Sequence, residues 1–497
     1  MLIFKRFWTQ DVGLPHHGPE EFTCPVSPKN TRAVFDGCGD LVERREAAGG
    51  TSVTVSVFWI DGTVSSGDVA EQVLRPLTDP GRFGGVKTAA DVMELLEGGA
   101  VYGSERRRTD SMDELAEALS YGHCAVVFEG AAMLFQLMTD QRRGVQEPAI
   151  EKTVKGAKDA LVESVKVNVG LVRSRLRTPR LKAAQTTIGR RSHTAAVILW
   201  LDGVAAPDLP QAMQKRLDGL DIDGLVLPDT VDSALSDAPL SPFPQVIHTE
   251  RPDRLAACLL DGRTALLVDG MPLAFITPAA LPEFLRTGED GAQHFMAASF
   301  LRLLRWAALL LALLAPAFYL ATAMYHAEMI PTELLLSVID SKQSVPFSTV
   351  TEILGMLVAF ELIQEAGLRL PDPVGQTVSI IGALIVGQSA VEAKVISPIA
   401  VIVVALAGIA GYTMPSQDLS MALRLCRFLL AAAGALAGMF GIVAGCGLLL
   451  WHLCSLESFG RAYVPAGGEG RSPLLRRPPW RDVARDPSLS GNLRRRT

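Results

Sequence analysis

A step in hydrophobicity near Leu301 constrains this 497-residue chain more than any other feature. Up to about His294 the sequence mixes charged residues with short apolar runs, as soluble domains do. The run 303–325 carries no charge after Arg305. Further apolar runs follow at 374–391, 396–413 and 428–451. A bilayer core of about 30 Å needs roughly 20 helical residues, and the first and last runs meet that length, so the sequence predicts an integral membrane protein.

The region before the step contains a repeated pattern of a strand followed by a turn. Val53–Gly62 and Ala195–Gly203 are two β-branched runs that end in an acidic residue and a glycine, the composition of a turn. A second pair of such units, Gly122–Gly130 and Gly262–Gly270, has the same separation of about 140 residues. Helical stretches lie between the strands, at Ser66–Leu77 and Pro210–Leu220. The repeat predicts a duplicated α/β subdomain.

The expected fold is an α/β soluble region of two tandem related subdomains, followed by an α-helical transmembrane bundle. We expect four full spans and one interfacial or re-entrant helix. The expected ranges are an extension without an assigned fold at 1–45, subdomain 1 at 46–145, a basic amphipathic helical linker at 146–192, subdomain 2 at 193–294, the transmembrane domain at 295–457 and an Arg-rich cytoplasmic tail at 458–497.

The linker carries one apolar stripe among many basic residues. Its apolar residues recur every three to four positions, at Leu161, Val165, Val169, Val172 and Leu176. Nucleic-acid binding is one interpretation of the basic residues, but no aromatic platform accompanies them, and we expect no nucleic-acid partner. The helix is expected to pack on a subdomain with its basic face in water. Contact with a neighbouring subunit or with an anionic membrane surface is the alternative.

Five hydrophobic segments can be drawn after the step, at 303–325, 348–366, 374–391, 396–413 and 428–454. The second contains Glu361, and a carboxylate near a bilayer centre costs at least about 2.5–3.5 kcal/mol, so this segment is expected to lie at the interface or face a watery path. Arg302 and Arg305 before the first span, and nine arginines after Phe459, favour both ends in the cytoplasm and hence four spans. That topology leaves Arg424 and Arg427 outside, which the same rule disfavours.

Several polar residues interrupt the apolar segments. Glu361, Gln388 and Glu392 are candidates for the lining of a polar pathway, because polar groups at membrane depth usually face water or one another. Hydrogen bonding at the interface or between helices is the alternative. Glu328 and Glu333 are candidates for the outer mouth of the pathway.

The last segment carries glycines with the spacing of a helix-packing face. Gly434, Gly438, Gly441 and Gly445 step by four, three and four residues, which places them on one face of a continuous helix. Small residues let a second helix approach closely. That face is expected to pack within the chain or between identical subunits.

No motif for catalysis or for a cofactor is present. The sequence has no GxxxxGK[ST] loop, no HExxH and no Cys/His cluster with zinc spacing, so we expect neither an enzyme nor a metal site. His16 and His17 could bind a metal with Cys24 and Cys38, but an unfolded leader is favoured. The seven scattered cysteines are expected to be free thiols. The start of the chain has no long apolar segment typical of a signal peptide, which predicts a cytoplasmic N-terminal domain.

A series of short motifs stands in a fixed order along the chain. They are Ser241–Gln245, His248–Asp253, Val268–Pro272, Glu328–Leu334, Val345–Phe347, Gly375–Leu384, Gly387–Glu392, Ser397-Pro398 and Ser458–Gly460. In these motifs the chain resembles the A subunits of spore germinant receptors, the GerA family. The resemblance covers about residues 50–460. The chain departs from the family pattern at Gly291, Ala292 and Ala327 and in the tail after Gly460.

The resemblance implies a subunit of a nutrient germinant receptor that triggers spore germination from the spore inner membrane. It implies as partners a permease-like B subunit, a lipoprotein C subunit and the membrane lipids, and it implies an oligomeric ring that conducts cations. A protein similar to stage V sporulation protein AF, of the same family, is an alternative. A secondary transporter is another, because short broken helices near the midplane are a transporter feature, although the membrane part shows no inverted repeat. A membrane-anchored scaffold is the third.

Overall fold

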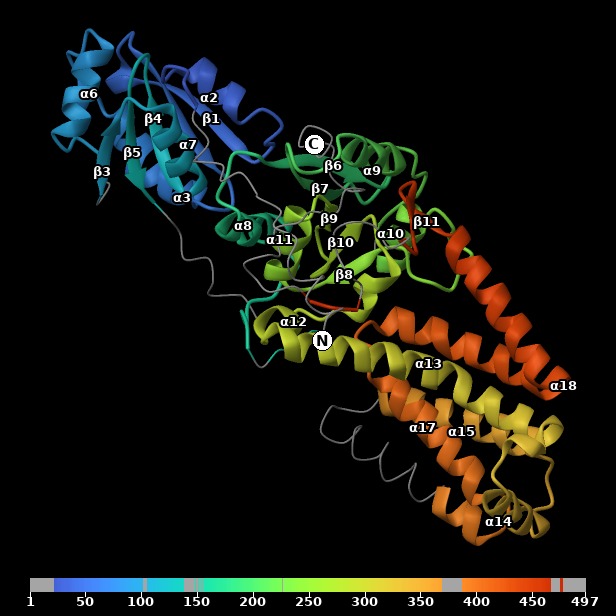
Figure 1. The fold of residues 1–497 in the computed structure, drawn as a ribbon. Helices are drawn as coiled ribbons and strands as arrows, with labels where there is room; N and C mark the ends of the chain where they lie inside the picture. Colours follow the sequence, from blue (N-terminus) through green and yellow to red (C-terminus); the bar gives the residue numbers. More distant parts are fainter. Residues whose placement is uncertain are drawn as a thin grey trace, which may run out of the picture. The chain divides into compact units, whose positions relative to one another are not determined.

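The computed structural model describes residues 22–101, 105–137, 148, 151, 153, 155–225, 227–368, 387–465 and 474–476. These residues form two compact units (Figure 1). The α/β unit contains the described residues up to Leu235 together with His248–Thr277. The helical unit contains Ser236–Ile247 and the described residues from Pro278 to Arg476.

Two five-stranded sheets make up most of the α/β unit. The first copy consists of α2 (Pro28–Val34), β1 (Leu41–Ala47), η1 (Ala48–Gly50), β2 (Thr54–Ile60), α3 (Ser66–Val69), η2 (Ala70–Leu74), α4 (Arg75–Thr78), α5 (Pro80–Phe83), α6 (Ala89–Glu97), β3 (Arg106–Thr109), α7 (Met112–Ser120), β4 (His123–Val127) and β5 (Ala132–Gln136). The second copy consists of α8 (Val165–Arg175), β6 (Leu181–Ile188), β7 (Thr194–Leu201), α9 (Asp208–Asp218), α10 (Pro228–Leu235), β8 (Ile247–Thr249), α11 (Pro252–Leu260), β9 (Thr264–Val268) and β10 (Ala274–Thr277).

The duplication predicted from the sequence is present in the structure. The strand order is β1-β2-β4-β5-β3 in the first sheet and β6-β7-β9-β10-β8 in the second, so corresponding strands occupy corresponding places. Backbone hydrogen bonds repeat as well: Asp61 N–H donates to Asp40 O and Asp202 N–H to Arg180 O, both over 2.8 Å. The turn glycines Gly62 and Gly203 both have positive φ, of 88° and 74°, which only glycine adopts without strain.

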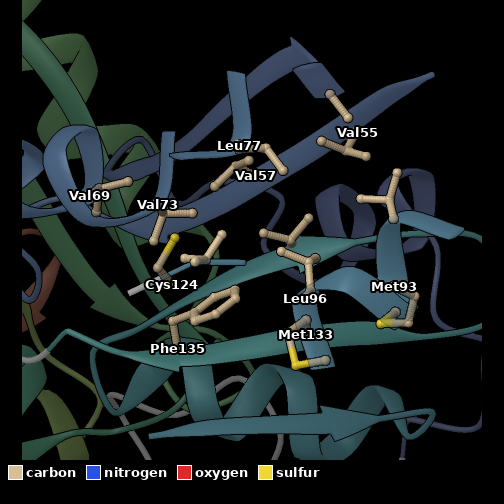
Figure 2. Close-up of a cluster of buried hydrophobic side chains, with 14 of the residues drawn as sticks. Val55, Val57, Val69, Val73, Leu77, Met93, Leu96, Cys124, Met133 and Phe135 are labelled. Atoms are coloured by element: carbon tan, nitrogen blue, oxygen red, sulfur yellow. The ribbon is translucent and has the colours of Figure 1, made fainter. Parts of the chain in front are cut away.

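The inner strands β2, β4 and β5 of the first sheet bury both of their faces, which explains their nearly continuous apolar sequences. Along β2, Val55 and Val57 point into the cluster shown in Figure 2, to which Trp59 and residues of α3, α4 and α6 also belong. Phe58 and Ile60 alternate with them and pack on the opposite side with residues of α2 and α7. Side chains alternate between the faces of a strand, so the sheet lies between two helical layers.

Two of the expected domain boundaries are wrong. The sequence assigns no fold to residues 1–45, yet Pro28–Val34 is helix α2 and the boundary at 45 cuts through β1. The linker 146–192 was expected to be helical, but among its described residues the helix covers only Val165–Arg175, and Leu181–Ile188 is strand β6. Both β1 and β6 are edge strands with partly exposed side chains, so they lack the apolar run that marked the inner strands.

Helix α8 and its surroundings join the two copies. The backbone of Gly37–Gly39 pairs with edge strand β6, through Gly39 N–H to Ala183 O over 2.8 Å. Gly170 of α8 lies against Gly62, so closely that a Cβ atom at Gly170 would stand 2.2 Å from Gly62 O. The guanidinium of Arg173 forms a bidentate ion pair with Asp40 and also donates to Leu181 O over 3.1 Å. Arg173 is only 1% exposed, so this charge pair is buried between the copies.

The helical unit begins earlier than the sequence predicts, because Pro278–His294 belongs to it rather than to subdomain 2. Its elements are η4 (Leu281–Leu285), α12 (Glu289–Ala292), α13 (Phe295–Tyr325), η5 (Ala327–Met329), α14 (Thr332–Gln343), α15 (Thr349–Leu368), α17 (Pro398–Tyr412), α18 (Gln417–Ser455), β11 (Glu457–Ser458) and β12 (Arg461–Ala462).

We predict that Arg173→Met strongly destabilises the junction between the copies. Removing one partner of a buried ion pair leaves Asp40 unpaired and costs about 3–5 kcal/mol. Native-state hydrogen exchange of β1 and β6 amides in the full-length protein measures this loss. Arg175→Met is the matched control on the same helix, because the Arg175–Asp159 pair is more than a quarter exposed at both side chains and is expected to contribute less than about 1 kcal/mol. Equal effects of the two substitutions would contradict the prediction.

Candidate functional site in the helical unit

Helices α13, α15, α17 and α18 share one apolar core. Leu320 of α13, Ile353 and Leu357 of α15, Ala400 of α17 and Ala431 of α18 are all fully buried in it. This packing makes α15 a member of the bundle. The polar side chains that accompany this core are the candidate functional site.

Glu361, predicted to lie at the interface or on a watery path, is paired with two arginines. Its carboxylate accepts hydrogen bonds from Arg427 and, over 3.3 Å, from Arg424. Arg427 is 4% exposed. An interfacial position was expected for this helix because the carboxylate of Glu361 had no partner. The structure supplies that partner, since Glu361 and Arg427 neutralise each other inside the bundle.

The same contacts correct the topology argument drawn from Arg424 and Arg427. The sequence predicts both in a connection before the last span, on the outer side. They lie instead within α18, which begins at Gln417, and both form ion pairs with Glu361 of α15. The positive-inside rule concerns residues in loops, so these two arginines do not count against cytoplasmic ends.

Glu352 is a buried carboxylate that was not among the residues predicted to form a site. It is 2% exposed, and its Oε2 accepts from the Ser397 hydroxyl over 2.8 Å and from Ser397 N–H over 3.3 Å. Ser397 is the N-cap of α17, where a negative charge is favoured by the helix dipole. Lys342 Nζ of α14 lies 3.8 Å from the other carboxylate oxygen. One carboxylate thus connects α14, α15 and α17. The only sequence signal near this site is Ser397-Pro398, a pattern typical of a helix N-terminus.

The other polar candidates lie on exposed surfaces. Gln388 Nε2 donates to Glu392 Oε1 over 2.8 Å, one turn along a short helix, and both side chains are exposed. Among the described residues no contact joins this pair to Glu361. Glu328 is exposed. A hydrogen bond with its own backbone and a second one with His326 Nδ1, over 3.3 Å, lower the pKa of its carboxyl group. Glu333 is exposed on α14.

The single glycine face predicted for the last segment does not exist, because α18 is broken at Gly438. This residue has φ 60° and ψ −140°, outside the helical region, and the two parts of α18 meet there at an angle (Figure 1). A Cβ atom at Gly441 would stand 2.1 Å from Ala433 O, and one at Gly445 would stand 2.6 Å from the Leu430 side chain. The second part therefore folds back onto the first. Gly434 faces a different helix, since a Cβ there would stand 2.8 Å from Ala317 O of α13.

The break also resolves a conflict of length. A straight helix of 39 residues would extend about 58 Å, far more than the bilayer core of about 30 Å. Each part on either side of Gly438 has roughly the 20 residues that one crossing needs. The expected single span 428–454 therefore becomes two antiparallel helical legs, one of which starts before Arg424.

Two of the described helices, α13 and α18, are long and apolar enough to cross a membrane, and α17 is a shorter apolar helix. The predicted segment 374–391 lies outside the described residues apart from its last five. The count of four full spans therefore stays a prediction.

A second group of charges holds the N-terminal end of α13. Asp290 is 1% exposed, and its carboxylate accepts two hydrogen bonds of 2.9 Å from Arg305 and one of 3.1 Å from Arg302. The Arg476 guanidinium donates to the backbone carbonyls of Asp290, Gly291 and Gln293. Burial alone would raise the pKa of Asp290, but its bonds to Arg305 and the charge of Arg302 outweigh burial, and the pKa lies below its ordinary value.

The segment that follows α18 is hydrogen-bonded to the segment that precedes α13. Ser458 Oγ, directly after α18, accepts from Ala279 N–H over 3.0 Å, and Leu281 N–H donates to Tyr463 O over 2.9 Å. Among the described residues, no group of three or more His, Cys, Asp and Glu side chains is close enough to hold a metal. All seven cysteines are free, as the sequence predicts.

Comparison with known proteins places this architecture in one family. The family described as Bacillus/Clostridium GerA spore germination protein matches residues 29–488. This chain belongs to the GerA family. The match confirms the resemblance that the ordered motifs indicate.

The GerA relatives cover nearly the whole chain. An uncharacterized membrane protein, YfkQ of Bacillus subtilis (strain 168), is 34% identical over 483 residues, which cover 93% of this chain and 91% of the relative. Spore germination protein KA of the same organism is 34% identical and covers 88% of this chain, with 81% of its own length matched. Spore germination protein GerLA of Bacillus cereus is 30% identical, with 88% of each chain matched.

One solved structure is also similar. The N-terminal domain of the A subunit of the Bacillus megaterium spore germinant receptor GerK3 is 25% identical, with a TM-score of 0.40, and the similarity covers 51% of this chain and 93% of that one. The assignment of two α/β copies rests on the strand order of this chain itself.

We predict that Glu361→Gln destabilises the helical bundle of this GerA protein by about 3 kcal/mol, because Arg427 is left buried without its charge partner. Thermal unfolding of the detergent-solubilised full-length protein measures the change. Asp340→Asn, an exposed acidic position on α14, is the control and should shift stability by less than about 0.5 kcal/mol. In the double variant Glu361→Leu with Arg427→Met, a large part of the loss should return. A double variant as unstable as the sum of its single changes would refute the buried pair.

We also predict that Asp290 makes the junction at α13 sensitive to acid. Its pKa is lower in the folded protein, so its ion pairs stabilise fully above the ordinary aspartate pKa of about 3.9 and lose that contribution as pH falls through the lower folded-state value. Asp290→Asn should therefore flatten the pH dependence of unfolding below about pH 4 and reduce stability at neutral pH. The neighbouring Glu289→Gln is the control and should keep the wild-type profile. An unchanged profile in Asp290→Asn would contradict the prediction.

Proposed function

We propose that this chain is the membrane A subunit of a nutrient germinant receptor and triggers spore germination. The observation that carries the proposal is the GerA family match over residues 29–488, together with relatives of nearly equal length that are spore germination proteins. On this proposal the chain lies in the inner membrane of the spore, with a permease-like B subunit and a lipoprotein C subunit as partners.

The proposed topology places both ends of the helical unit on the cytoplasmic face. The support is that the start of α13 and the segment after α18 are bonded to the same stretch, through Asp290 with Arg302 and Ser458 with Ala279. If both ends lie on one face, the number of crossings is even. The two legs of α18 replace one expected span by two, so an even count also requires α15, which packs in the same core, to cross.

The proposed activity is the conduction of cations by an oligomer of this chain. Gln388 and Glu392 are the residues that we propose to line the path, because both are exposed and neither has a charge partner among the described residues. Glu361 has a different proposed role: its arginine pairs hold α15 against α18. Glu328 and Glu333 are proposed at the outer mouth.

The outer surface of the bundle supports contact with lipids or with a second copy. Large apolar side chains are exposed along α18, including Leu429, Leu436, Phe440, Val443 and Trp451. Exposed apolar area on this scale is stable only where lipid or another subunit covers it.

We predict that deleting the gene from its spore-forming host abolishes or strongly slows nutrient-induced cation release and germination, and that the wild-type gene restores both. Complementation with Glu392→Gln should change the rate or the ion selectivity of release, because it removes the charge from the proposed path. Release is measured in spores whose membranes contain equal amounts of the protein. Glu289→Gln is the matched control outside the path.

The two parts of the proposal fail separately. Normal germination of the deletion strain under every nutrient would reject the receptor role. Restoration by the wild-type gene, with Glu392→Gln releasing cations at the wild-type rate and selectivity, would reject only the assignment of the path.

A further inference from the structure

A loop of the second α/β copy is packed into the helical unit. Residues 236–247 connect α10 to β8, both elements of that copy, yet this stretch forms one compact unit with the helices. The side chain of Gln245 holds the loop together: its Oε1 accepts from the N–H groups of Asp237 and Ala238, and its Nε2 donates to Ala238 O. Gln245 is 2% exposed. These bonds fix the conformation of the loop from within.

The loop contacts the end of the last helix at three points. A hydrogen bond of 2.9 Å joins Ser241 Oγ to His452 Nε2 of α18, and the His452 ring packs on Phe243 at 6.0 Å between centroids. Ser458 Oγ donates to Gln245 O over 3.0 Å. Gly460 N–H donates to Asp237 Oδ2 over 3.3 Å. The motifs Ser241–Gln245 and Ser458–Gly460, more than 200 residues apart in the sequence, are therefore in direct contact.

The hydroxyl of Ser458 is the point where three segments meet. It is fully buried, donates to the loop at Gln245 and accepts from Ala279, which begins the stretch leading to α13. A displacement of the loop would therefore act on the end of the last membrane helix and on the approach to the first one at once.

We propose that loop 236–247 and the segment His452–Gly460 form a coupling joint, through which the second α/β copy controls the conformation of the helical bundle. His452 and Ser458 are its positioning residues. This inference rests on the proposed function, because the joint regulates the proposed cation path.

The test uses the full-length chain with its partners in spores. His452→Leu removes the bond to Ser241, and Ser458→Ala removes both bonds of the central hydroxyl. Allosteric coupling between sites commonly amounts to a factor of about 5–150, so each variant should shift the nutrient concentration for half-maximal cation release at least about fivefold, or raise release without nutrient, at wild-type protein levels. His452→Gln and Ser458→Thr, which keep a hydrogen-bonding group, should retain most of the response. Cys454→Ser, at an exposed position of the same helix end, should behave as wild type.

Wild-type responses of His452→Leu and Ser458→Ala at normal protein levels would overturn the joint and leave the receptor role standing. If the Ser458→Ala protein does not accumulate in spores, the response of the His452→Leu variant decides alone, because His452 is only half-buried.

Hydrogen exchange of the purified full-length chain separates the joint from the receptor role. If deletion of the gene leaves germination normal, the receptor role fails, and the joint is judged by exchange alone. His452→Leu must then raise the exchange of amides in α13 and in the Gln417–Ala437 leg as well as in the loop. A change confined to the loop and the adjacent helix end would overturn the joint.

Discussion

The helical unit depends on pairing the charges buried between its described helices. An isolated carboxylate or guanidinium in a low-dielectric interior is too costly to keep, so Glu361 has to lie beside Arg424 and Arg427. That requirement holds α15 against the first leg of α18. Glu352 imposes the same requirement on α14 and α17, because its two oxygens face Lys342 and Ser397. The ionic contacts therefore select one arrangement among helices whose apolar surfaces would tolerate several.

The backbone of α18 supplies the second constraint. Gly438 takes a conformation that side-chain-bearing residues rarely adopt, and the closeness of the two legs leaves no room for a Cβ atom at Gly441. The fold-back returns the chain to the side from which α13 started. As a consequence, Ser458 can bond to Ala279 and to the loop at Gln245. A straight helix would have carried this segment far from both.

The α/β unit shows how duplicated domains diverge in their contacts while keeping their topology. The two sheets share their strand order and even the hydrogen bonds at Asp61 and Asp202. They differ in what their connections contact. In the second copy the connection from α10 to β8 belongs to the helical unit, where Gln245 O accepts a hydrogen bond from Ser458.

Local patterns in the sequence determined the elements of this protein, and tertiary structure decided how they combine. The apolar run of α13, the duplicated strands and the turn glycines were predictable because helix, strand and turn each have a short-range signature. The edge strands β1 and β6 were missed because strands with partly exposed faces lack a strong apolar pattern. The partners of Glu361, the break at Gly438 and the contact between Ser241 and His452 were not predictable from spacing. A charge does not specify which distant residue neutralises it, and a glycine spacing suits a straight face and a sharp bend equally well.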